Sequence, residues 1–134
     1  MDYVYHERKW PAMVRNESLA WAKKNGLKYL IFVDDDATVI GNGLTSLVRD
    51  MENHPEYVAM SGKIRDSKNN VTLLGGPLRD DMFYHFTDRR GIWESDWVGG
   101  GYTIHRVEPY LPYDEEYQTG FNDYDWSMNA KKLG

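Results

Sequence analysis

Three consecutive aspartates after an apolar segment carry the strongest chemical signal in the chain. Asp34, Asp35 and Asp36 directly follow residues 29–33, whose sequence is Tyr-Leu-Ile-Phe-Val. Like charges this close repel one another, and a divalent cation with oxygen ligands is their natural compensator. Because side chains alternate along an extended backbone, we expect Asp34 and Asp36 to point to one side and Asp35 to the other. The pattern predicts a metal site at Asp34 and Asp36.

A solvated turn would use the same aspartates differently. Aspartate is a common turn former, so the run could cap a strand and open a turn before the next helix. Position favours a binding site, because ligands of open α/β sheets gather beyond the carboxyl ends of strands. Both interpretations stay open on the acidic run alone.

The elements predicted around the acidic run alternate between helix and strand. Residues 11–25 are predicted to form a helix, with proline at its start and glycine after its end. The apolar run 29–33 predicts a buried strand, residues 44–51 an amphipathic helix, and residues 57–64 a further strand. This alternation predicts an α/β domain with a mixed, mainly parallel sheet.

The second half of the chain gives weaker structural signals. Two short apolar segments, 71–74 and 82–86, flank a Gly-Gly-Pro sequence, which favours a hairpin or two edge strands. Glycines 99–101 precede the short apolar segment 102–104, and residues 123–133 are predicted to form a closing helix.

Composition and charge exclude several classes of function. The chain has 134 residues, 41% of them hydrophobic, which predicts a single folded domain. A net charge of -5 disfavours a nucleic-acid groove, which needs a basic face. Cysteine is absent, so disulfides, thiolate zinc sites and cysteine nucleophiles are excluded. The longest apolar run is too short to span a membrane and no signal peptide precedes it, so we expect a cytoplasmic location.

Several segments together resemble a known enzyme family. The helix segment 14–22 contains an Arg-Asn pair, the strand and acidic run occupy 29–36, and the glycine-containing segment spans 98–106. Two acidic segments, 113–117 and 120–126, follow in order. This succession resembles the family-2 glycosyltransferases of the GT-A fold, and the likeness covers most of residues 12–134. It implies a three-layer α/β/α architecture.

The resemblance implies roles for the acidic run and for Arg15. Asp34 and Asp36 would hold a divalent metal, Mn²⁺ or Mg²⁺, that bridges the diphosphate of a nucleotide-sugar donor. Asp34 could instead contact the ribose, and Asp35 would also lie at the sugar nucleotide. Arg15 could contact the diphosphate, although a solvated helix charge explains it equally well.

On the acceptor side the resemblance singles out Asp123 and the glycines. Asp123 would be the general base that removes a proton from the hydroxyl of a carbohydrate or other acceptor, with inversion at the anomeric carbon. Gly100 and Gly101 would allow close approach of the backbone, although a strand bulge also explains them.

The chain also departs from the family. Asn122 stands where glutamate is usual, and Asn129 where arginine is frequent. The family's first strands, which bind the nucleotide base, have no counterpart before Tyr3. We therefore expect residues 1–134 to form a truncated domain, whose exposed sheet edge would allow self-association into a homo-oligomer.

Two other functions remain open. An apolar strand followed by an acidic run also fits haloacid-dehalogenase-like phosphatases, with Asp34 as nucleophile and Asp36 as acid/base. Such an enzyme needs a second acidic pair after another strand, and Asp123 with Asp125 is the candidate. The chain could also be a non-catalytic domain that binds sugar nucleotides.

Overall fold

The structure is a computed structural model that describes residues 9–73, 91–92, 94–118 and 120–133. The predicted segment 82–86 lies outside these ranges. The elements, in chain order, are α1 (Pro11–Lys24), β1 (Tyr29–Val33), α2 (Gly43–Asn53), β2 (Ala59–Ser61), β3 (Ile64–Arg65), β4 (Val71–Leu73), β5 (Tyr102–Arg106) and α3 (Asn122–Lys131). The described chain is therefore a mixed α/β protein.

The main sheet has three strands in the order β1-β5-β2, and β5 pairs antiparallel with both neighbours. Ile104 at the centre of β5 lies opposite Ile31 of β1 and Met60 of β2. β1 and β2 consequently run in the same direction, as the helix–strand alternation predicts. The described strand pairs nevertheless do not show a mainly parallel sheet, because β5 enters between β1 and β2.

The predicted strand over 57–64 is divided in two. Its first part is β2, and its second part, β3, pairs with β4 in a separate antiparallel hairpin. The chain changes partner at Gly62, whose N–H donates to the carbonyl of Tyr102 at 2.8 Å. A Cβ at Gly62 would lie 2.1 Å from the Tyr102 ring, so this crossing needs glycine.

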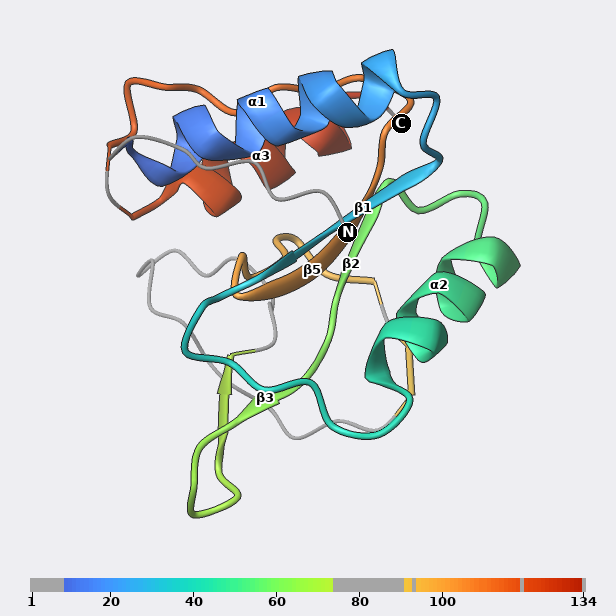
Figure 1. Cartoon of the computed structure of the whole chain (residues 1–134), viewed down its shortest axis with the longest axis vertical. Helices are drawn as coiled ribbons and strands as arrows, with labels where there is room; N and C mark the ends of the chain where they lie inside the picture. Colours follow the sequence, from blue (N-terminus) through green and yellow to red (C-terminus); the bar gives the residue numbers. More distant parts are fainter. Residues whose placement is uncertain (1–8, 74–90, 93, 119, 134) are drawn as a thin grey trace.

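Helices cover both faces of the sheet (Figure 1). α1 and α3 lie on one face, where Ala12, Leu19 and Trp126 form a core with Phe32 of β1. α2 lies on the other face, packed against β5 and β2. The buried residues of α1 are Ala12, Leu19 and Ala22, which form its apolar side.

The stripe predicted for α2 is correct only in part. Leu47 and Met51 are buried and Val48 is half-buried, whereas Leu44 is 45% exposed. Leu44 lies in the first turn of the helix. Both outer strands, β1 and β2, are edges of the described sheet, and self-association through such an edge stays a prediction.

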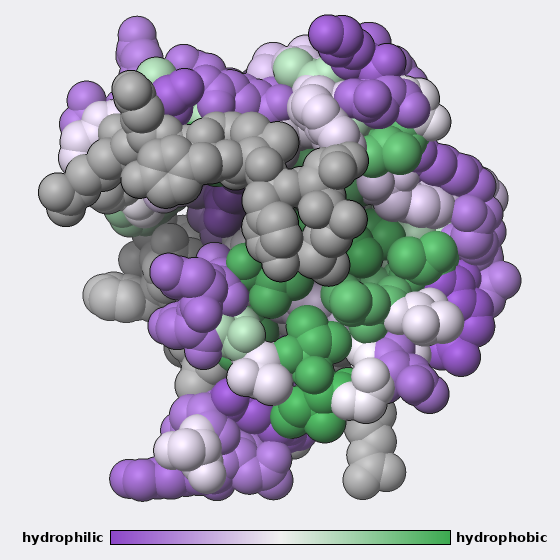
Figure 2. All heavy atoms as spheres, in the orientation of Figure 1, coloured by the Kyte–Doolittle hydropathy of each residue, from purple (hydrophilic) through white to green (hydrophobic). Residues whose placement is uncertain are grey.

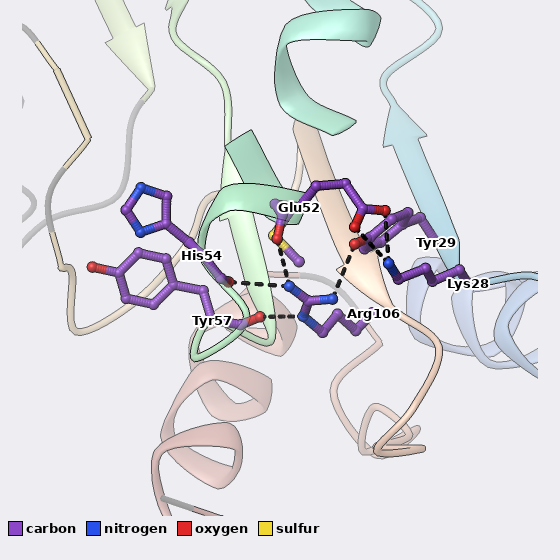
Figure 3. A network of polar contacts seen from close by, with 7 residues as sticks. Lys28, Tyr29, Glu52, His54, Tyr57 and Arg106 are labelled. Atoms are coloured by element: carbon purple, nitrogen blue, oxygen red, sulfur yellow. Dashed lines mark hydrogen bonds and ion pairs between the residues drawn. The ribbon is translucent and has the colours of Figure 1, made fainter. Parts of the chain in front are cut away.

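Arg106, at the end of β5, holds the end of α2 against the sheet (Figure 3). Its Nη2 donates to the carbonyls of Met51 at 2.5 Å and His54 at 3.0 Å, and its Nε donates to that of Tyr57 at 2.7 Å. Its Nη1 donates to the Tyr29 hydroxyl at 3.0 Å. The last turn of α2 has no basic residue of its own, so Arg106 supplies the cation that satisfies its terminal carbonyls.

Replacing Arg106 with glutamine should destabilise the fold, because one shorter side chain cannot reach all four oxygens. We expect the free energy of unfolding to fall by about 2–4 kcal/mol in urea denaturation. Arg49→Gln is the matched control, since the Arg49 side chain is 66% exposed and its partner among the described residues is its neighbour Asp50. The control should stay within roughly 0.5 kcal/mol of the parent, and equal effects would contradict the assigned role of Arg106.

Candidate functional site

The buried glycine segment 99–101, just before β5, is where three of the predicted site residues meet, namely Arg15, Asp34 and Asp123. The N–H of Gly100 donates to Asp123 Oδ2 at 3.0 Å. The carbonyl of Gly101 accepts a hydrogen bond from the N–H of Asp34 at 2.9 Å. The backbone of this segment thus joins the first turn of α3 to the end of β1.

Two of the predicted ligand-binding side chains pack directly on the glycines. A Cβ at Gly100 would lie 2.2 Å from Arg15 Nη2, and a Cβ at Gly101 would lie 2.6 Å from Asp34 Oδ2. A side chain at either position would force the guanidinium or the carboxylate to shift. Glycine therefore leaves the space that Arg15 and Asp34 occupy here.

Arg15 projects from α1 into an aromatic and amide environment. Its guanidinium carbon lies 5.6 Å from the centroid of the Phe32 ring and 5.2 Å from that of Tyr113. Its Nη1 donates to Oδ1 of the buried Asn122 at 3.0 Å. Arg15 forms no ion pair with a carboxylate of the described residues, so its positive charge is held by neutral partners.

Two buried, uncharged side chains, His105 and Tyr113, lie together, and the Tyr113 ring also contacts the Arg15 guanidinium. His105 is 1% exposed, and its Nε2 lies 3.3 Å from the Tyr113 hydroxyl. Burial, with a smaller contribution from the Arg15 charge, lowers the pKa of His105 to about 3. Burial also raises the pKa of Tyr113. Both groups are uncharged at neutral pH, so Arg15 carries the positive charge of this cluster.

The acidic run forms a turn instead of continuing the strand. The N–H of Ala37 donates to the carbonyl of Asp34 at 3.0 Å, so the backbone bends at Asp35 and Asp36. The strand-alternation argument was therefore wrong beyond Asp34. Asp34 and Asp36 nevertheless line one cleft of about 1550 Å³, and Asp35 does not line it.

Both apolar and charged residues line this cleft. Val33, Ile40 and Met60 contribute apolar side chains, and the charged lining residues besides Asp34 and Asp36 include Lys63 and Asp66. Figure 2 shows apolar side chains gathered on the face of the molecule around α2. A concave space that combines apolar surface with polar groups is typical of a small-molecule site.

The carboxylates available for a metal are few. Within residues 9–73, 91–92, 94–118 and 120–133, no group of three or more His, Asp and Glu side chains is arranged to hold a metal ion. Asp34 and Asp36 therefore have no third protein ligand in these ranges. Mg²⁺ is often bound by one or two carboxylates together with substrate phosphates, so this donor set fits a cation that arrives with a diphosphate.

Asp123 lies half-buried in the first turn of α3. Besides the Gly100 bond, its Oδ1 accepts the N–H of Tyr124 at 3.0 Å. Asp125 of the same helix accepts a hydrogen bond from Asn129 at 3.0 Å. Because Asp123 and Asp125 lie within a helix, they do not provide the strand-end acidic pair that a haloacid-dehalogenase-like phosphatase needs.

Two asparagines, Asn16 and Asn122, position parts of the site, although no role had been predicted for them from the sequence. Asn16 exchanges two hydrogen bonds with the backbone of Tyr113, at 2.7 and 2.9 Å, and so ties α1 to the segment before α3. Asn122 orients Arg15. A sequence signal existed for Asn16, because asparagine inside a helix usually finds a specific hydrogen-bond partner.

No family model, curated protein or solved structure matches this chain. Among the described residues, no helix is sufficiently long and apolar to cross a membrane. The arrangement of side chains around glycines 99–101 is accordingly the basis for the function proposed below.

A double-mutant cycle tests the contact between Gly100 and Arg15. Gly100→Ala should lower the free energy of unfolding by about 1–3 kcal/mol, because the added methyl group and the guanidinium compete for one space. In an Arg15→Ala background the same substitution should cost much less. Urea denaturation of the four proteins gives the coupling energy, and strictly additive effects would show that Arg15 does not occupy this space.

Proposed function

We propose that the chain is a GT-A-like glycosyltransferase domain that moves a sugar from a nucleotide-sugar donor to an acceptor hydroxyl with inversion. The observation that carries this proposal is the convergence of Arg15, Asp34 and Asp123 on glycines 99–101. These residues come from distant parts of the chain. In this proposal, the β1-β5-β2 sheet with helices on both faces belongs to a three-layer GT-A domain.

The donor side is supported by Asp34 and Asp36 in the cleft and by Arg15 at Gly100, although Arg15 is not among the residues that line the cleft. Asp34 and Asp36 line it together and would hold Mn²⁺ or Mg²⁺, which offsets negative charge on the departing nucleoside diphosphate when bound. Arg15 presents a guanidinium without a carboxylate partner among the described residues, and such a group suits a diphosphate.

The acceptor side depends on Asp123. Backbone N–H groups of Gly100 and Tyr124 fix its carboxylate, and a carboxylate has about four acceptor positions, so some are left for a hydroxyl proton. The acceptor oxygen bonds to the anomeric carbon while the bond from that carbon to the diphosphate oxygen breaks. Asp123 takes the hydroxyl proton, and the diphosphate leaves with the bonding electron pair.

One observation favours a second candidate, a non-catalytic domain that binds sugar nucleotides. The Asp123 carboxylate already serves a structural purpose, because it holds Gly100 against α3. Such a domain would use the same Arg15, Asp34 and Asp36 but would not need Asp123 for chemistry. The two candidates therefore differ in what Asp123 does.

Asp36→Asn should abolish metal-dependent binding of the donor, because it removes one of the two carboxylates that would hold the metal. Calorimetry with UDP-, GDP- and dTDP-sugars, with and without Mn²⁺, measures this effect. Asp35→Asn is the matched control, since Asp35 carries the same charge in the same turn without lining the cleft. The metal site would be misplaced if both variants lost binding equally or if neither did.

Asp123→Asn should leave donor affinity intact and lower the transfer rate by roughly 10²–10⁴-fold. Asparagine keeps the shape and one oxygen that can accept the Gly100 N–H, so the glycine segment should stay in place. Asp125→Asn provides a control from the same helix. Full transfer activity in Asp123→Asn would exclude it as the base, whereas donor binding without transfer in the parent protein would favour the non-catalytic candidate.

A further inference from the structure

Phe121 has a backbone conformation that a bulky residue rarely adopts. Its φ of 56° and ψ of -6° place it in the left-handed region, immediately before α3. The preceding Gly120 is also left-handed, with φ of 70°, as glycine readily is. A phenylalanine in this region is an outlier, and such outliers cluster at functional sites.

Burial of the ring does not offset this backbone strain. The Phe121 residue is 53% exposed, so a large part of its aromatic surface faces solvent. Its carbonyl accepts the N–H of Asp125 at 2.9 Å, which any residue at this position could do. Glycine would satisfy the same backbone with less strain, so the side chain has no evident structural reason in the described protein.

The residues that follow Phe121 connect it to the candidate site. Asn122 accepts the hydrogen bond from Arg15, and Asp123 accepts that from Gly100. α3 begins at Asn122, so the exposed ring is carried on a rigid helix end two positions before the proposed base. The backbone of Phe121 is thus one and two positions from residues whose side chains bond to Arg15 and Gly100.

We propose that Phe121 is a stacking platform for a saccharide ring of the acceptor. This inference rests on the function proposed above and deepens it, since it makes the acceptor a carbohydrate. The C–H groups on one face of a pyranose pack on an aromatic ring, and its hydroxyls need polar neighbours, which Asp123 and Arg15 supply. The stacked sugar presents a hydroxyl toward Asp123.

Phenylalanine-selective ¹³C labelling tests the platform directly, because the chain contains 4 phenylalanines and therefore few ring signals. Methyl glycosides of glucose, galactose and mannose are titrated in the absence of nucleotide and metal. We expect at least one of them to shift the Phe121 signal, which is assigned by its loss in Phe121→Trp. The Trp variant should bind the same glycoside, because its ring also stacks.

Phe121→Gly separates the platform from a structural role. It should keep or raise the melting temperature, because glycine adopts the left-handed conformation freely, while glycoside affinity falls about three- to tenfold. Trp21→Ala is the control, because Trp21 is a similarly exposed aromatic residue, 46% exposed, within the regular helix α1. It should leave glycoside affinity unchanged.

Each outcome decides between the proposals. The platform is overturned if Phe121→Gly leaves glycoside affinity unchanged, or if no glycoside shifts the Phe121 signal. A lower melting temperature of Phe121→Gly overturns it as well, because it would show that the ring supports the fold. Absence of sugar transfer together with the expected Phe121 shifts would overturn the proposed transferase function and leave the saccharide site intact.

Discussion

The candidate site depends on one steric constraint, the absence of side chains at Gly100 and Gly101. The Arg15 guanidinium fills the space that a Cβ would take at Gly100, and the Asp34 carboxylate fills the corresponding space at Gly101. The backbone of these glycines bonds to Asp123 of α3 and to Asp34 at the end of β1. A cation and two carboxylates are thereby gathered around a short stretch of main chain, although they belong to three different elements.

Much of the fold follows from local sequence patterns. The proline at the start of α1, the apolar run of β1 and the spacing of Leu47 and Met51 in α2 are local features, and each predicted its element. The position of β5 could not be predicted in this way. β5 is joined to its two neighbours only by contacts distant in sequence, and alternation of helices and strands says nothing about a strand that enters later between them.

The candidate site was predictable by residue type more than by geometry. Arg15, Asp34 and Asp123 were singled out by their motifs, and the structure brings them together at the glycines. The bend after Asp34 was one of two open interpretations, because aspartate suits both an extended strand end and a turn. Asn122 positions Arg15, which lies 107 positions earlier in the chain, and a local sequence pattern cannot predict such a distant contact.

The setting of Arg15 has a consequence for the entropy of binding. An exposed arginine samples many rotamers, and fixing them when a ligand binds costs free energy. Here the aromatic faces of Phe32 and Tyr113, together with the amide of Asn122, already hold the guanidinium in one orientation. The conformational cost is met during folding, so the charge is preorganised and an anion that reaches it gains the full electrostatic attraction without first ordering the side chain.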